Sequence, residues 1–412
     1  MAFRDECNYI VKSAIDRVLP DEAVRRALCG RKFPDGKLVL VSVGKAAWNM
    51  ANAANEVLGD ALSDGIVITK HGYSRGNIGR LKIFEAGHPV SDADTFSASE
   101  KVLRMTENLS ENDTVIFLLS GGGSALFEVP KINSGELQQI NSQLLASGAD
   151  IVEINTVRKR LSKVKGGRFA LHCAPGKLFA VILSDIIGDP LDMIASGPAY
   201  PDSSTCAQAL GVIEKYGISL SAEAQKCLKT ETPKEINNVE TAVTGSVREL
   251  CKAAADACRR LGYEPVILTE SLSCEARDAG EMLAGKVREN AKTKTPLAFI
   301  AGGETVVHVT GKGKGGRNQE IALSAAKGIS GIKNAAVFSV GSDGTDGPTD
   351  AAGGFVDGNT KAMLSAKGID IDKVLADNDA YNALLSCDGL IFTGPTGTNV
   401  NDISVALIKT EE

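Results

Sequence analysis

The chain has 412 residues, which exceeds what one hydrophobic core normally serves and predicts two globular domains. Its formal net charge of −6 excludes a general nucleic-acid-binding surface, because such a surface is basic. The first residues form a polar helical pattern and no apolar run is long enough to cross a bilayer, so we expect a cytoplasmic protein without membrane contacts. Nine scattered cysteines without CxxC pairs favour buried thiols over zinc or disulfides.

Short apolar runs alternate with helical patterns along the whole chain, which is typical of parallel sheets covered by helices. The predicted strands are 38–43, 66–69, 115–119 and 179–183, and then 242–244, 265–268, 297–300, 306–310, 336–340 and 390–393. Apolar residues at three- and four-residue steps predict helices such as 46–58, 95–109, 136–145 and 248–261. The alternation predicts the α/β class for both halves.

A polar segment, TETPKEINNVE at 230–240, separates two α/β series and predicts a domain boundary. The expected domains are therefore 1–232 and 233–412. Two alternatives stay open: the segment could be a long surface connection inside one domain, or the last strand could return to the first domain.

In an open α/β sheet, ligands bind beyond the carboxyl ends of the strands. The unusual residues of this chain follow predicted strands in that way. The sequence SGGGS follows a buried-looking strand, and its backbone N–H groups could point at a phosphate, although a flexible turn is the simpler interpretation. We interpret it as a phosphate-binding loop made of Ser120, Gly121, Gly122, Gly123 and Ser124.

A second glycine-rich loop, GKGKGGR at 311–317, formally matches the dinucleotide fingerprint GxGxxG. No acidic residue follows about twenty positions later to hold a ribose. The cationic loop therefore favours a triphosphate, with a solvated hairpin tip as the alternative. The candidates in this loop are Lys312, Lys314, Gly315, Gly316 and the catalytic candidate Arg317.

Acidic residues supply the metal and catalytic candidates. Asp343 and Asp346 lie in the long loop GSDGTDGPTDAAGG and, with Glu304, could bind Mg²⁺, although aspartates also form turns. Asp185 and Asp189 follow another strand, where one of them could orient the proton of an acceptor hydroxyl or instead cap a helix.

Lys45 directly follows the first strand and would bring a fixed ammonium to the sheet end, although most lysines are solvated surface charges. The basic run 158–168 is interpreted as a solvated helix face, with Arg158 as the exception that could contact substrate. The four histidines show no metal spacing. His88 is interpreted as an ordinary loop histidine rather than a substrate contact.

No Walker A, HRD, DFG or GxSxG motif is present. The chain resembles, over nearly its whole length, the glycerate kinases of the class that includes the MOFRL proteins. The resemblance is carried by VSVGKAAWNMA, EAGHPV, LLSGGGSALFE, NTVRKRLSKVKGGR, LSDIIGDPLDMIASGP, AGGETVVHVTGKGKGGRNQE, SVGSDGTDGPTDAAGG and TGPTGTNVNDI.

The resemblance implies a Rossmann-like N-terminal domain, a smaller α/β C-terminal domain and an active site in the cleft between them. It implies ATP and Mg²⁺ as cofactors and D-glycerate as the acceptor, with 2-phosphoglycerate as the product. Lys45 and Arg317 match the family's active-site lysine and arginine, and Arg158 is a candidate for the glycerate carboxylate. The rivals are an NAD(P)-dependent hydroxypyruvate reductase and a non-catalytic sensor; the choice between monomer and homodimer stays open.

Overall fold

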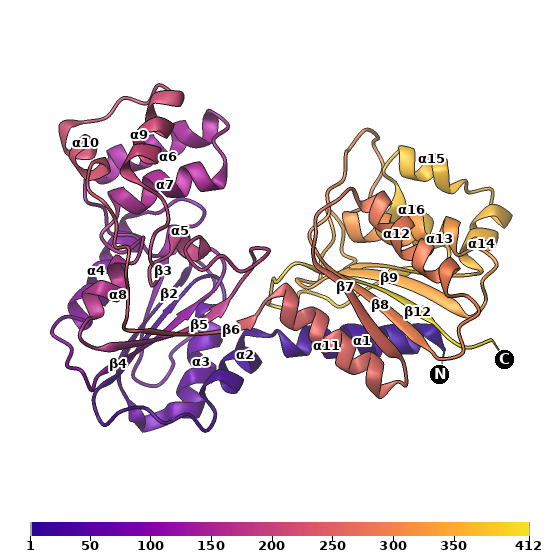
Figure 1. Cartoon of the computed structure of the whole chain (residues 1–412), viewed down its shortest axis with the longest axis horizontal. Coiled ribbons are helices and arrows are strands. Elements are labelled where there is room, and N and C mark those ends of the chain that lie inside the picture. Colours follow the sequence, from indigo (N-terminus) through magenta and orange to yellow (C-terminus); the bar gives the residue numbers. More distant parts are fainter. Residues whose placement is uncertain (1, 412) are drawn as a thin grey trace. The chain divides into compact units, whose positions relative to one another are not determined.

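The computed structural model describes residues 2–411, which form two compact units. The N-terminal unit comprises residues 20–184 and 189–244, and the C-terminal unit comprises residues up to 19, 185–188 and those from 245 onward. Each unit contains one six-stranded sheet with helices packed on it (Figure 1). None of the helices formed by the described residues is long and apolar enough to cross a membrane.

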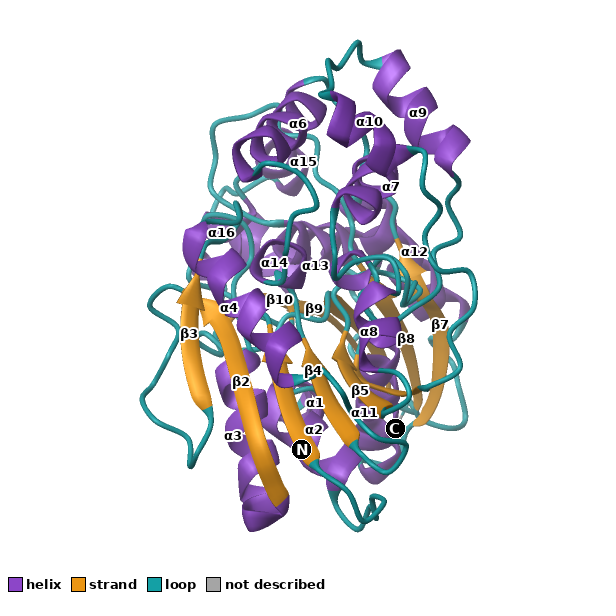
Figure 2. Cartoon of the chain, turned by 90° about the vertical axis from the view of Figure 1, so that its left-hand side faces the viewer, coloured by secondary structure: helices purple, strands orange, loops and turns teal. Residues whose placement is uncertain are grey.

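The sheet of the N-terminal unit is parallel at every recorded register. Its strands are β1 (Leu38–Val43), β2 (Leu62–Lys70), β3 (Lys82–Ala86), β4 (Thr114–Leu119), β5 (Lys177–Leu183) and β6 (Val239–Gly245). They lie in the order β3-β2-β1-β4-β5-β6, with parallel registers from β3 through β5. Figure 2 shows β3, β2, β4 and β5 following one another in this order. This is the Rossmann order, which reverses between β1 and β4 and binds ligands beyond that point. Both of these central strands are fully buried, which explains their unbroken apolar runs.

Helices cover this sheet and also form a separate helical group. They are α2 (Pro20–Leu28), α3 (Ala47–Leu58), α4 (Ala93–Met105), α5 (Gly123–Leu126), α6 (Ser134–Ala146), α7 (Ile151–Leu161), α8 (Arg168–Cys173), α9 (Cys206–Lys215) and α10 (Ala222–Leu228), with 3-10 turns at Gly59–Ala61 and Ile194–Ser196. Helices α2 and α3 pack their apolar sides on the sheet. Helices α6, α7, α9 and α10 share a small apolar core of their own (Figure 1).

The sheet of the C-terminal unit is mixed. Its strands are β7 (Glu264–Leu272), β8 (Leu297–Gly303), β9 (Ala335–Gly341), β10 (Gly353–Asp357), β11 (Leu390–Ile391) and β12 (Asp402–Ile408), in the order β11-β10-β9-β12-β8-β7. Only the β7–β8 pair is parallel among the described strands, and the other pairs are antiparallel. The start of β12 therefore lies beside the ends of β8 and β9, where Asp402 pairs with Gly303 and Gly341.

Both faces of this second sheet are covered. The helices are α1 (Phe3–Arg17), α11 (Val247–Arg260), α12 (Ala276–Glu289), α13 (Arg317–Gly328), α14 (Thr360–Ala366), α15 (Ile371–Ala376) and α16 (Ala380–Ser386). Alternate residues of β8 point to opposite faces. Ala298 and Ile300 join the core formed with α1 and α11, whereas Phe299 and Ala301 join the core formed with α12 and α13.

The predicted α/β class, the Rossmann-like N-terminal sheet and the smaller C-terminal unit are confirmed. The second sheet is not the parallel one that the alternation predicts. No helix separates β9 from β10, and antiparallel neighbours can be joined without a helical crossover. The segment 306–310 is not a strand, and Val309 is 76% exposed.

The structure also differs from the predicted division into 1–232 and 233–412. Strand β6 belongs to the N-terminal sheet, so the two units part between Thr244 and Gly245. Helix α1 packs against α11 and belongs to the C-terminal unit. The last strand, β12, pairs with β8 and β9 and does not return to the N-terminal sheet.

Candidate active site

The loops after β1 and β4 meet at the point where the strand order of the N-terminal sheet reverses. The Lys45 N–H group donates to the Gly121 carbonyl at 2.9 Å. A side chain at Gly44 would place its Cβ 2.2 Å from the Ser120 hydroxyl oxygen, and Gly44 has a φ of 128°. Only glycine allows the two loops to approach this closely.

Free donors gather in this pair of loops. Among the described residues, no acceptor binds the backbone N–H groups of residues 121–124, which precede or begin the one-turn helix α5. The Lys45 ammonium likewise makes no hydrogen bond or ion pair with a described side chain or carbonyl, and the residue is half-buried. A cation and several N–H groups thus remain available for an anion.

Lys165 anchors the end of the SGGGS loop through hydrogen bonds. Its ammonium donates to the carbonyls of Ser124 at 2.8 Å and Phe127 at 2.7 Å, and lies 3.4 Å from a carboxylate oxygen of Glu128. The Lys165 side chain is fully buried, and burial lowers its pKa while Glu128 opposes that effect. This buried ammonium ties both ends of α5 to the rest of the unit.

The basic run that contains Lys165 is not the solvated face that the sequence predicts. Lys159 and Arg160 are 2% and 0% exposed, respectively. Lys159 donates to Asp202 at 3.0 Å and Arg160 to Glu231 at 3.1 Å. Buried cations are tolerated here because carboxylates distant in the sequence pair with them.

We expect Lys165→Met to destabilise the protein by about 3 kcal/mol, because removing one partner of a buried pair leaves Glu128 buried and uncompensated. Urea unfolding of the full chain measures this loss, with the exposed Lys229→Met as the control. Adding Glu128→Gln to Lys165→Met should recover part of the stability. A Lys165→Met protein as stable as the wild type would contradict the assignment.

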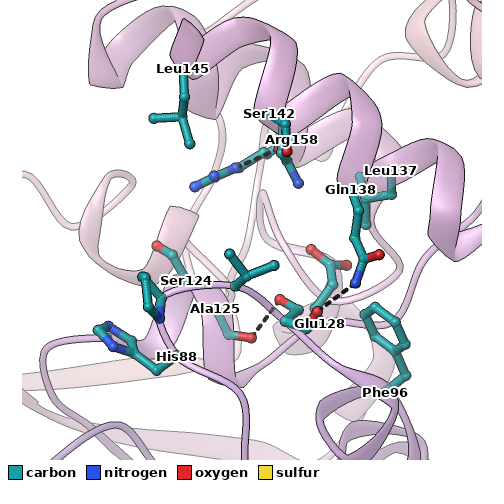
Figure 3. Close-up of a pocket in the computed structure, with 15 residues that line it drawn as sticks. His88, Phe96, Ser124, Ala125, Glu128, Leu137, Gln138, Ser142, Leu145 and Arg158 are labelled. Carbon is teal, nitrogen blue, oxygen red and sulfur yellow. Dashed lines mark hydrogen bonds between the residues drawn. The ribbon is translucent and has the colours of Figure 1, made fainter.

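A cavity of about 150 Å³ adjoins the SGGGS loop (Figure 3). Its wall includes Gly122 and Ser124 from that loop, His88 from the loop after β3, and Arg158 from α7. One water requires roughly 15 Å³ by this measure, so the cavity suits a molecule of a few carbon atoms. The larger hollows recorded in this unit lie elsewhere, at the amino ends of the strands.

Arg158 is the cation of this cavity. Its Nε donates to the Asn141 side chain at 2.8 Å, and the described residues offer no acceptor to its two terminal nitrogens. Burial lowers the pKa of Arg158, and Glu128 partly opposes this. Figure 3 shows the guanidinium pointing toward the side of the cavity where Ser124 and His88 lie. The two free nitrogens match the geometry of a carboxylate.

The two predicted strand-end aspartates lie in different units. Residues 185–188 pack with the C-terminal unit, where the Asp185 carbonyl accepts from the Asn401 side chain at 3.3 Å. Asp189 belongs to the N-terminal unit, has a φ of 49°, and buries one carboxylate oxygen that has no partner among the described residues. Neither aspartate lines the cavity beside Arg158.

Arg317 is the centre of a charged cluster in the C-terminal unit. Its guanidinium binds Asp402 through Nε at 2.5 Å and Nη2 at 3.1 Å, and binds Glu304 through Nη1 at 2.7 Å. Burial opposes the charge of Arg317, but the bonds to Asp402 and the nearby carboxylates raise its pKa overall. Asp402 was not predicted from the sequence, because its position depends on the antiparallel register of β12.

Of the three predicted metal ligands, Asp346 is committed to another role. Its carboxylate accepts the backbone N–H groups of Asn318 at 3.1 Å and Gln319 at 2.9 Å, and so caps helix α13. Burial raises the pKa of Asp346 to about 7. Glu304 is exposed but is bound by Arg317, whereas Asp343 is half-buried and accepts only the Thr345 N–H group at 2.9 Å among the described residues.

These carboxylates do not form a ready-made metal cage. In the part of the chain that the structure describes, Glu304, Asp343 and Asp346 do not bring three ligand oxygens within 4.8 Å of one another. Hard oxygen ligands still suit Mg²⁺, which in nucleotide sites uses one or two carboxylates together with phosphate oxygens. The residues therefore fit a metal that arrives with a nucleotide.

The glycines of the GKGKGGR loop have a structural explanation. A Cβ at Gly311 would lie 2.2 Å from the Asp377 backbone, and one at Gly313 would lie 2.4 Å from the Asp379 Cβ. The N–H groups of residues 311–314 all donate to the segment 377–379. A nucleotide phosphate could therefore meet the exposed Lys312 and Lys314 side chains and the N–H groups of residues 315–316, which donate to no described residue.

Comparison with known proteins assigns this arrangement to a family. Residues 6–229 match the model described as a domain of unknown function, DUF4147, and residues 297–402 match the MOFRL family. The chain is 52% identical over 405 residues, 97% of each chain, to a protein of Thermotoga maritima named D-glycerate 2-kinase. The chain belongs to the MOFRL class of glycerate kinases.

A solved structure agrees in fold with this MOFRL-class chain, and a further relative is similar to it in sequence. A crystal structure of a glycerate kinase from Thermotoga maritima covers 98% of the chain at a TM-score of 0.92 and 51% identity, with 99% of that structure matched. A relative from Agrobacterium vitis, 39% identical over 91% of this chain and 88% of its own length, carries a provisional name as a hydroxypyruvate reductase. The resemblance stated from sequence motifs is confirmed at the level of the family.

Within this MOFRL-class chain, the predicted site residues fall into two groups, one in each unit. Lys45, Arg158 and the SGGGS loop belong to the N-terminal unit, whereas Arg317, Glu304 and the Asp343–Asp346 loop belong to the C-terminal unit. Sequence reasoning missed Asp402 and Lys165, and it assigned no function to His88. The signal available for Lys165 was its place in a family segment, NTVRKRLSKVKGGR.

Proposed function

We propose that this chain transfers the γ-phosphoryl group of ATP to D-glycerate, with 2-phosphoglycerate and ADP as the products. The observation that carries the proposal is the meeting of Lys45 with the free N–H groups of residues 121–124 at the reversal point of a Rossmann-like sheet. An anion site beside a small cavity with an arginine in its wall is what a kinase for a short carboxylic acid requires. Membership of the MOFRL class of glycerate kinases supports the same substrate pair.

In this proposal, the protein acts mainly by positioning its substrates and neutralising charge, which is most of what phosphoryl transfer requires. The SGGGS loop binds phosphate oxygens through its N–H groups. Lys312, Lys314, Gly315 and Gly316 bind the remainder of the triphosphate. Lys45 and Arg317 offset the charge that develops on the transferred group and help to hold the acceptor.

Mg²⁺ belongs to the proposal as the companion of ATP, where it would neutralise charge between the β- and γ-phosphates. Asp343 is the half-buried candidate ligand that neither pairs with a cation nor caps a helix among the described residues, since Glu304 binds Arg317 and Asp346 caps α13. Asp185 or Asp189 would orient the acceptor hydroxyl from its strand-end position.

We expect Arg158→Gln to raise KM for glycerate about 100-fold with a smaller effect on KM for ATP. The reason is that Arg158 has two uncommitted nitrogens for the glycerate carboxylate, and a hydrogen bond to a charged group contributes about 1.5–3 kcal/mol. Initial rates at varied glycerate measure the change, with the exposed Arg104→Gln as the control. An unchanged KM for glycerate would remove Arg158 from the acceptor site.

The function itself is tested by product analysis. Purified protein with ATP, Mg²⁺ and D-glycerate should release ADP only when glycerate is present, and the phosphorus NMR spectrum should identify 2-phosphoglycerate. The rival reductase predicts oxidation of NADH or NADPH by hydroxypyruvate instead, and a sensor predicts binding without turnover. The occupied N–H groups of residues 311–314 count against a dinucleotide pyrophosphate at that loop.

A further inference from the structure

His88 differs from the other three histidines of the chain in its hydrogen bonding. Neither of its ring nitrogens has a partner among the described residues. Each of the others has one bonded ring nitrogen, in His71 to Asp92 at 2.9 Å, in His172 to the Leu103 carbonyl at 2.9 Å and in His308 to Glu275 at 2.7 Å. An imidazole that lines a cavity without a partner among the described residues is available to a ligand.

The His88 ring lies against the phosphate-loop candidate. A Cβ built on Gly122 would lie 3.0 Å from His88 Nε2, 2.9 Å from His88 Cδ2 and 3.2 Å from the Lys45 Cγ. The absence of a side chain at Gly122 therefore makes room for both His88 and Lys45. Nε2 of the imidazole is thus on the side of the ring that faces the loop.

The same imidazole lines the cavity that contains Arg158 (Figure 3). A three-carbon hydroxy acid bound through its carboxylate to Arg158 would have its hydroxyl groups within the cavity. In this cavity His88 is on the side of Ser124, next to the free N–H groups of the SGGGS loop. The acceptor hydroxyl, the imidazole and the proposed phosphate site are thereby neighbours.

The surroundings of His88 favour its neutral form. Burial lowers the pKa of His88, and the ammonium groups of Lys45, at the end of β1, and Lys70, at the end of β2, lower it further. The charged groups in the cavity wall are Arg158 from α7 and Glu128, whose carboxylate lies beside Lys165. A neutral imidazole has a free lone pair with which to accept a proton.

We propose that His88 is a catalytic residue that accepts the proton of the acceptor hydroxyl during phosphoryl transfer. This inference rests on the proposed glycerate kinase activity and deepens it. The hydroxyl oxygen forms a bond to the γ-phosphorus, and the bond between that phosphorus and the β,γ-bridging oxygen breaks with its electron pair leaving on ADP. The hydroxyl proton passes to the imidazole, which then releases it to solvent.

This proposal gives His88 a role toward the acceptor hydroxyl that the sequence analysis had assigned to Asp185 or Asp189. Neither aspartate lines the cavity, whereas His88 does. A carboxylate that only orients the hydroxyl and an imidazole that takes its proton make different predictions for the dependence of the rate on pH.

The test compares His88→Ala, His88→Asn and the control His71→Asn. General-base catalysis contributes about 10²–10⁴-fold, so both His88 variants should lose at least 10²-fold in kcat while KM for ATP changes little. In the wild type, kcat should fall as the pH is lowered and His88 becomes protonated. This acidic limb of the kcat–pH profile should disappear in the His88 variants and persist in His71→Asn. Added imidazole should restore turnover to His88→Ala in proportion to its unprotonated fraction, which a purely structural role would not produce.

A direct measurement on the unchanged protein keeps the proposal testable if the variants fold poorly. Nitrogen NMR of wild-type chain carrying ¹⁵N-histidine should show one imidazole that titrates below the ordinary range and shifts when glycerate binds. The proposal is overturned if the His88 variants keep the acidic limb, if imidazole rescues nothing, or if Asp189→Asn alone removes the limb. A wild-type protein that phosphorylates no glycerate would instead refute the proposed function.

Discussion

Lys45→Met should lower kcat for glycerate phosphorylation about 10³-fold while the protein stays folded. The ammonium of Lys45 has no partner among the described residues, so its removal breaks no interaction that stabilises the fold. The methionine keeps a stem of similar length, with a Cγ that fits the space left by the missing side chain of Gly122. The expected loss follows from removing one preorganised cation from a developing negative charge, an effect of about 10²–10³-fold or more.

The measurement is a steady-state assay at saturating ATP and glycerate, with thermal unfolding of the same preparation. Lys82→Met removes an exposed lysine on β3, 60% exposed and paired with Asp64, and should leave kcat unchanged. Lys45→Met with near wild-type kcat would show that the lysine plays no part in the reaction. A loss confined to KM for ATP would mean that it binds the nucleotide equally well before and during transfer.

The N-terminal sheet was predictable because its central strands are buried on both faces. A fully buried parallel strand must be apolar at every position, so β1 and β4 stand out as unbroken runs. Strand β10 was not predicted, because it begins with glycines rather than with an apolar run. A Cβ at Gly353 would lie 1.9 Å from the Ser339 carbonyl oxygen, so the close approach of β10 to β9 requires glycine at this position. Strand prediction from sequence instead depends on β-branched and apolar residues.

The candidate site was only partly predictable. Glycine and lysine after buried strands indicated Lys45 and the SGGGS loop, because parallel strand ends converge. The buried cations Lys159 and Arg160 could not be recognised, since Asp202, which pairs with both, lies far along the chain. The rule that lysines and arginines face solvent was therefore the wrong guide for 158–168, and it was correct only as an average over proteins.

The GKGKGGR loop shows a further limit of motif reasoning. Its glycines satisfy a dinucleotide pattern, yet Gly311 and Gly313 are explained by close packing on the backbone at 377–379. A pattern of glycines indicates that the backbone closely approaches either a ligand or another part of the chain. The sequence alone does not distinguish these two cases.

Arg317→Ala is expected to produce two separable losses. The Arg317 guanidinium has five N–H donors, of which three bind Asp402 and Glu304. The arginine is therefore held in a fixed orientation, and its other two donors have no acceptor among residues 2–411. Losing those free donors should lower kcat about 10³-fold, as removal of a cation from phosphoryl transfer does. Arg317→Lys should recover little, because an ammonium cannot reproduce the planar fork.

The second loss is in stability. Asp402 is only 7% exposed as a side chain, and without Arg317 its carboxylate is buried and uncompensated. Because Arg317 is itself 33% exposed, water replaces part of the interaction, and we expect a cost of about 2 kcal/mol rather than the 3–5 kcal/mol of a fully buried pair. The exposed Arg248→Ala should change neither kcat nor stability measurably.

The double variant Arg317→Ala with Asp402→Asn distinguishes the two effects. Replacing the carboxylate with an amide removes the buried charge, so urea unfolding should return most of the lost stability while kcat stays about 10³-fold below the wild type. Recovery of both stability and kcat would mean that Arg317 serves only to neutralise Asp402. Recovery of stability alone would identify the two free donors of Arg317 as the part of the side chain that the reaction uses.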